Sequence, residues 1–132
     1  MTGLYPIASQ MASPDLIRRP LRDLLRKLPL LPLTETGIPD YVSANPDLLV
    51  GLAESAELVL RIVHDGFSAI GLLHTCTAQQ IASGYISAAH TAALGRLLVE
   101  LGDALVYVQA LSFECRRYTA DYVSDAKAAG DR

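Results

Sequence analysis

Residues 45–84 read NPDLLVGLAESAELVLRIVHDGFSAIGLLHTCTAQQIASG, and this stretch decides the fold. Two neighbouring rows of largely apolar residues recur in it at seven-residue spacing. The rows are Leu49, Ala56, Val63, Ile70 and Thr77, and Leu52, Val59, Gly66, Leu73 and Gln80. Residues at such spacing share one face of an α-helix, whereas a half-buried strand would alternate every second residue. The stretch therefore predicts a long amphipathic helix.

The predicted helix covers about residues 46–83. Asn45–Pro46 suits its start, because asparagine caps free backbone N–H groups and proline fits the first helical position. Gly84 suits its end, since glycine readily adopts the left-handed conformation that terminates helices. Asp65–Gly66 and Gly71 offer competing breaks that would give shorter helices. A single helix is preferred because the apolar stripe crosses both sites without losing its phase.

A second helix is predicted at about residues 88–126, with Ser87 as its cap. Its apolar face again follows a seven-residue spacing. That face contains Leu94, Leu101, Val108, Cys115 and Tyr122. Two helices of equal length joined by a short link favour an antiparallel arrangement. We therefore expect an all-α fold in which residues 45–128 form a two-helix hairpin.

Residues 1–44 are predicted to be an N-terminal arm within the same single domain, because 132 residues fit one domain. A short basic amphipathic helix is expected at residues 21–28. The two prolines of residues 28–33 favour an extended course after it. Residues 34–44 contain glycine and proline and are predicted to be a connector.

Charge is unevenly distributed along the chain. Residues 1–33 contain five basic and two acidic residues, while the remainder contains six basic and twelve acidic ones. The basic side chains of this segment are Arg18, Arg19, Arg22, Arg26 and Lys27. They could bind an anionic partner such as nucleic acid or a membrane surface. We prefer the interpretation that they pair with the acidic body, which itself argues against nonspecific nucleic-acid binding.

A two-helix hairpin cannot cover all the apolar surface of this chain. Val99, Val106 and Phe113 form a row on the side of the last helix opposite its main stripe. Monomers rarely expose apolar patches of this extent. The row predicts that the N-terminal arm folds back, that two hairpins pair into a dimeric four-helix bundle, or both.

Catalytic and metal-binding signatures are weak in this sequence. It has no Gly-x-Ser-x-Gly element, no phosphate-binding loop and no Glu-x-x-His pair of the di-iron type. His74, Gln80 and His90 could form a polar patch near the turn, without defined chemistry. Cys115 is expected to be buried and, along the helix axis, far from Cys76. We therefore expect no catalysis, no metal and no cofactor.

The sequence is best interpreted as that of a noncatalytic helical interaction protein. We expect it to form a homodimer and to act as an adaptor or regulator. Two alternatives stay open: a module that contacts an anionic partner through the basic helix, and a carrier of small apolar ligands. No run of about 20 predominantly apolar residues is present, although residues 66–95 contain no charged side chain. The expected location is therefore the cytoplasm.

Overall fold

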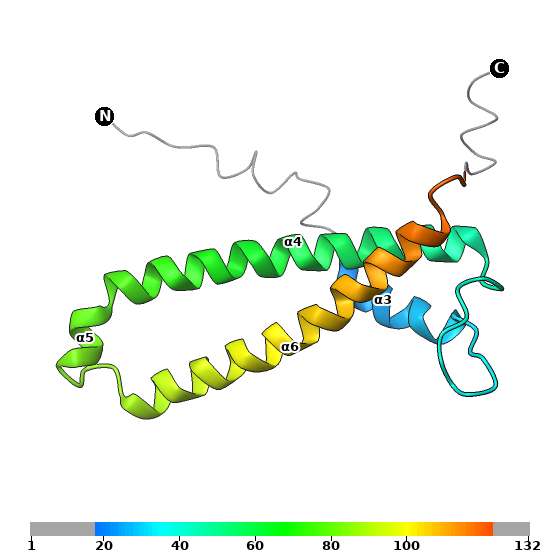
Figure 1. Ribbon diagram of the computed structural model, residues 1–132. Coiled ribbons are helices and arrows are strands. Elements are labelled where there is room, and N and C mark those ends of the chain that lie inside the picture. Colours follow the sequence, from blue (N-terminus) through cyan, green and yellow to red (C-terminus); the bar gives the residue numbers. More distant parts are fainter. Residues whose placement is uncertain (1–17, 123–132) are drawn as a thin grey trace, which may run out of the picture.

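The computed structural model describes residues 18–122, and this part of the chain is all-α (Figure 1). Its helices are α3 (Pro20–Lys27), the 3-10 helix η1 (Leu28–Leu30), α4 (Pro46–Cys76), α5 (Ala78–Ala82) and α6 (Ala88–Tyr118). The β-structure of the described residues is a single isolated bridge between Leu33 and Pro39. The all-α prediction is confirmed. Residues 1–17 of the predicted N-terminal arm lie outside the described residues.

The two long helices, α4 and α6, determine the shape of the molecule. Each contains 31 residues, which corresponds to roughly 46 Å of helix. They run side by side in opposite directions and are connected through α5, while α3 packs on α4 (Figure 1). We call residues 60–111 the arm. The opposite end of the molecule, which we call the base, contains α3, residues 28–59 and residues 112–122.

Polar side chains cap the starts of both long helices, as predicted. The Asn45 Oδ1 atom accepts a hydrogen bond from the backbone N–H of Asp47 at 2.9 Å. The Ser87 Oγ atom accepts one from the backbone N–H of His90 at 3.3 Å. Each cap satisfies a backbone donor that has no partner inside its helix.

The first long helix ends earlier than the predicted bound of 83. α4 stops at Cys76, and Thr77 separates it from the short α5. The Thr77 hydroxyl donates to the carbonyl of Leu73 at 2.9 Å, a type of bond that favours bending of a helix. Gly84 does adopt the left-handed conformation, with φ at +79°, but it follows α5.

The second long helix also ends before its predicted bound of 126. α6 stops at Tyr118, and residues 123–126 lie outside the described residues. A threonine again follows the last helical residue. The Thr119 hydroxyl donates to the carbonyl of Cys115 at 2.7 Å, and the backbone leaves the helical conformation at that threonine.

The segment that follows α3 is only partly extended. Residues 28–33 were predicted to be extended because of their two prolines, but Leu28–Leu30 form η1. The prediction was wrong there because proline fits the first turn of a helix, where no N–H is required. The chain becomes extended at Leu31 and then turns at Gly37, whose φ is +80°.

The hydrophobic core lies entirely at the base. Its buried residues come from α3, the connector, α4 and α6. They are Leu24, Leu31, Ala44, Leu49, Leu52, Ala53, Ala56 and Cys115. The Tyr41 ring of the connector stacks on the Tyr118 ring of α6, with 5.6 Å between their centroids. Elements distant in sequence therefore meet in one small core.

Two polar contacts fasten α6 to α4 at the base. The Arg116 guanidinium donates to both carboxylate oxygens of Glu57, at 2.8 and 2.9 Å. The Tyr122 hydroxyl donates to Asp47 at 2.7 Å, which ties the segment after α6 to the first turn of α4. Both contacts align the two long helices where the core forms.

Leu52→Ala tests whether the base supplies most of the stability. Leu52 is fully buried, so its truncation should lower the free energy of unfolding by about 2–5 kcal/mol. Leu72→Ala is the matched control in the arm, because Leu72 is 66% exposed and its truncation should cost less than about 0.5 kcal/mol. Urea unfolding followed by circular dichroism measures both. Equal losses in the two variants would contradict a core confined to the base.

The Glu57–Arg116 pair should make stability depend on pH. The hydrogen bonds from Arg116 hold the pKa of Glu57 below its ordinary value of 4.5. The folded state thus favours the carboxylate, so the pair stabilises the fold above about pH 4.5 and loses this effect as the pH falls through the lowered pKa.

Glu57→Gln should therefore destabilise the protein at pH 7 and have little effect at pH 2. The loss at pH 7 should stay below about 1 kcal/mol, because both side chains are almost half exposed. Urea titrations at the two pH values measure the difference, with Glu100→Gln as the control for removing one negative charge. A loss that is the same at both pH values would show that the ion pair is not its cause.

Candidate interaction surface

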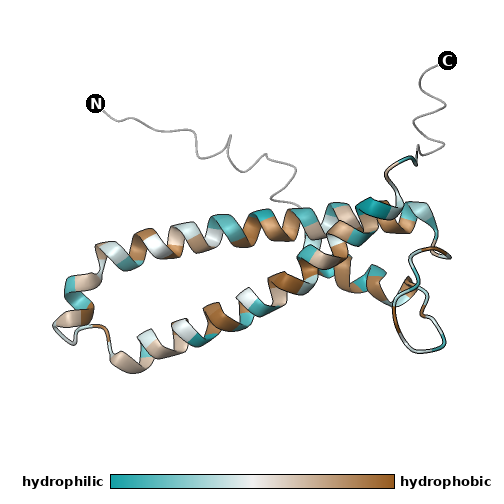
Figure 2. Ribbon diagram, viewed as in Figure 1, coloured by the Kyte–Doolittle hydropathy of each residue, from teal (hydrophilic) through white to brown (hydrophobic). Residues whose placement is uncertain are grey.

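The arm has no core of its own. Residues 60–111, all of which the structure describes, contain no fully buried residue. Hydrophobic residues occur along both of its helices (Figure 2). Even those on the predicted inner stripe, such as Val63, Ile70, Leu94 and Leu98, are only half-buried. Two helices share a single seam, so each leaves much of its apolar surface uncovered.

One apolar stripe of α4 passes from the covered base into the uncovered arm. Val59, Ile62, Gly66 and Leu73 follow one another on the same side of the helix. Val59 is buried at the base, but Ile62 is 48% exposed and Leu73 is 64% exposed. The eight residues of α3 extend for only about 12 Å, so α3 covers only the base. The exposed part of the α4 stripe begins beside the N-terminal end of α3.

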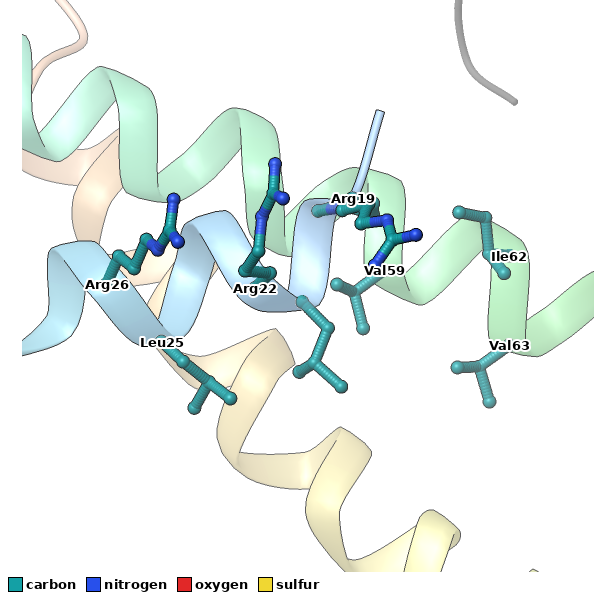
Figure 3. Close-up of a pocket in the computed structure, with 9 residues that line it drawn as sticks. Arg19, Arg22, Leu25, Arg26, Val59, Ile62 and Val63 are labelled. Atoms are coloured by element: carbon teal, nitrogen blue, oxygen red, sulfur yellow. The ribbon is translucent and has the colours of Figure 1, made fainter. Parts of the chain in front are cut away.

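An open hollow of about 640 Å³ lies where α3 begins beside α4. We call it the α3–α4 hollow. Its lining residues are Arg19, Pro20, Leu21, Arg22, Leu25, Arg26, Val59, Ile62 and Val63. In Figure 3, Arg22 and Arg26 extend from α3 in the direction opposite to Leu25. The lining of the hollow is therefore almost wholly apolar, and the guanidinium groups of Arg22 and Arg26 point away from the Leu25 side chain.

No acidic side chain lines the α3–α4 hollow. Arg22 lies 3.7 Å from Asp23 on its own helix, and both side chains are substantially exposed. Among the described residues, Arg19 and Arg26 have no ion-pair partner. Arg19 and Arg26 therefore present their positive charge to solvent beside the hollow.

The five predicted basic residues do not form one surface. Arg19, Arg22 and Arg26 line the α3–α4 hollow, whereas Arg18 lies in a separate hollow with Glu54, Glu57, Leu58 and Arg61. Lys27 points to α4, and a side chain added at Gly51 would come within 3.0 Å of its Nζ atom. Within residues 18–122, no ion pair joins the basic residues of α3 to the long helices, contrary to the preferred interpretation. Binding of an anionic partner stays a prediction.

The outer row of α6 is exposed as the sequence indicated. Val99, Val106 and Phe113 each expose more than 60% of their surface. Their seven-residue spacing places them on one side of the helix, away from the half-buried stripe. That this row binds a partner stays a prediction.

The three residues of the predicted polar patch near the turn do not come together. His74 and His90 line one hollow of about 250 Å³ between the long helices, but Gln80 lines another. The His90 Nδ1 atom lies 2.9 Å from the Ser87 Oγ atom at the start of α6. Within residues 18–122, no three histidine, cysteine or acidic side chains are placed to hold a metal ion.

Sequence reasoning missed the α3–α4 hollow and the exposure of Tyr85. The hollow depends on where α3 begins beside α4, which no local pattern specifies. In the structure, Leu21 and Leu25 are more than half exposed, whereas Leu24 of the same helix is buried. Tyr85 is 88% exposed in the turn that precedes α6.

The two cysteines occupy contrasting environments, as expected. Cys115 is buried in the core, whereas Cys76 is exposed at the end of α4. Burial raises the pKa of the Cys115 thiol to about 11, so very little thiolate exists near neutral pH.

Thiol titration should therefore detect one reactive cysteine in the native protein. With a disulfide reagent at pH 8, Cys76 should react rapidly and Cys115 only after denaturation, because the thiolate is the reacting form. The Cys76→Ser variant should lose the fast phase. Two equally fast phases in the native protein would mean that the core around Cys115 is open.

None of the described helices combines the length and the apolar character that crossing a bilayer requires. Comparisons with protein-family models, with curated proteins and with solved structures found no match to this chain. We therefore infer a function from the geometry of the arm and of the α3–α4 hollow.

Proposed function

We propose that this protein is a noncatalytic helical interaction protein whose arms self-associate, so that two chains form a four-helix bundle and act as an adaptor or regulator. The observation that supports this proposal is the absence of any fully buried residue in the arm, residues 60–111. A second pair of helices would cover the apolar surface that one pair leaves exposed. The hydrophobic effect would drive that association.

Small residues in the arm favour close approach of a partner. A side chain added at Gly66, Gly71, Gly95 or Gly102 would meet no other atom within 4 Å. Gly71 and Gly95 line a hollow between α4 and α6, so the open space beside these two glycines lies along the seam of the arm. A second copy could bring its helices close to the backbone at these positions, as tight helix packing requires.

Charge also favours association through the arm. Residues 66–95, which include the turn, contain no acidic residue, lysine or arginine. Burying a charge without a counter-charge is costly. Because this surface carries almost no charge, a partner could cover it at little electrostatic cost. The core of a stable interface is likewise depleted in charged residues.

The mass in solution tests this proposal. Sedimentation equilibrium of the full chain at micromolar concentration should give a dimer. Ile62→Glu and Leu73→Glu should raise the dissociation constant at least about 100-fold, because each would place an unpaired charge in the interface. Val42→Glu is the control at an exposed position of the base and should leave the dimer intact.

Circular dichroism should show that all three variants keep their helix content. A wild-type protein that is monomeric at these concentrations would overturn the proposal. Equal dissociation in the Val42→Glu variant would also count against it, since the effect would then not depend on the arm.

A further inference from the structure

The seam between the two long helices contains space that the side chains of this chain do not fill. We infer that this seam binds a small, uncharged, apolar molecule that carries one hydrogen-bonding group. The inference goes beyond the self-association proposed above, because it concerns the space between α4 and α6 of a single chain.

Two adjoining hollows of about 390 and 250 Å³ lie between α4 and α6 in the arm. Four residues line both of them, and we call the two together the seam hollow. The shared residues are Ile70, His74, Thr91 and Leu94. Sites for small molecules are typically about 300–1,000 Å³ in volume and mostly apolar, with a few polar groups. The seam hollow has this size and this composition.

Two glycines keep the seam hollow open. Gly71 of α4 and Gly95 of α6 both line its larger part. Neither glycine has a positive φ, and a Cβ atom added at either would meet no other atom within 4 Å. Glycine is disfavoured inside a helix, and here neither its backbone conformation nor a close contact within the chain requires it. What the two glycines do provide is room between the helices.

The lining of the seam hollow favours an uncharged ligand. None of its residues is aspartate, glutamate, lysine or arginine. A carboxylate, phosphate or ammonium group placed there would lose water without meeting an opposite charge from these residues, which is costly. Phe67 and Leu98 line the larger part, and Ile81 and Ile86 line the smaller part near the turn. The body of the ligand should therefore be apolar.

His74 is the side chain best placed to bind the polar group of the ligand. It lines both parts of the seam hollow. The hydroxyls of Thr77 and Thr91 already donate to backbone carbonyls one turn earlier, and the His90 Nδ1 atom lies 2.9 Å from the Ser87 Oγ atom. Within residues 18–122, the His74 imidazole has no hydrogen-bond partner. An imidazole can donate or accept a hydrogen bond, so a hydroxyl or an amine of the ligand suits it.

Fluorescence titration of the full chain with N-phenyl-1-naphthylamine tests the inference. This probe is an uncharged aromatic amine whose emission rises when it leaves water. The wild-type protein should bind one probe per chain. Gly71→Leu and Gly95→Leu should each weaken binding at least about tenfold, because the new side chain would occupy the space that the probe needs.

Gly66→Leu and Gly102→Leu are the matched controls on the same two helices. A side chain added at either position also meets open space, but neither residue lines the seam hollow. Both variants should bind the probe within about twofold of the wild-type affinity. All four changes replace a helical glycine with a better helix former, so circular dichroism should show that every variant keeps its helix content.

Competition between two molecules of equal chain length tests the chemical class of the ligand. At pH 8, 1-decanol should displace the probe at a lower concentration than decanoate, because the carboxylate would have no charged partner in the seam hollow. His74→Leu should weaken the binding of 1-decanol about threefold or more, since the hydroxyl would lose its hydrogen bond. Equal displacement by the two competitors would contradict an uncharged ligand.

The outcomes also separate this inference from the proposed function. Undiminished probe binding in Gly71→Leu and Gly95→Leu would overturn the inference, and loss of binding in Leu25→Glu instead would place the probe in the α3–α4 hollow. A dimeric wild-type protein without glycine-dependent binding would overturn the inference alone. A monomeric wild-type protein whose probe binding depends on Gly71 and Gly95 would overturn self-association alone.

Discussion

A pair of helices has one seam, and this constraint determines what the rest of the structure requires. At the base, α3 and the connector add further surfaces, so Leu49 and Leu52 are buried completely. In the arm, α4 and α6 have only each other, so the corresponding positions of the same stripe are half-buried, as at Val63 and Ile70, or exposed, as at Leu73. A single sequence pattern therefore produces a complete core at one end and an incomplete one at the other.

The polar contacts follow the same division. The Glu57–Arg116 pair and the Tyr122–Asp47 hydrogen bond both lie at the base, where they align the long helices. The arm from residue 66 to residue 95 has no charged side chain with which to hold its helices in register. The base thus specifies the geometry of one chain, and the arm offers a neutral apolar surface to another.

Long-range periodicity made most of the fold predictable. The seven-residue spacing identified both long helices, and the Asn45 and Ser87 caps located their starts. The helix ends were less predictable, because α4 and α6 end just before Thr77 and Thr119 although the apolar pattern continues beyond both threonines. The exposed row on α6 was visible in the sequence, but the α3–α4 hollow was not. It arises from the position of α3 against α4, which depends on tertiary packing rather than on any local pattern.

The central claim is that the arm is completed by a second chain, and amide hydrogen exchange as a function of concentration tests it most directly. Local opening governs exchange, so each segment reports its own stability. Protection of residues 60–111 should rise as the protein concentration increases, while protection of the core residues at the base stays constant. Strong arm protection that equals that of the base, at a dilution where the protein is monomeric, would contradict the account.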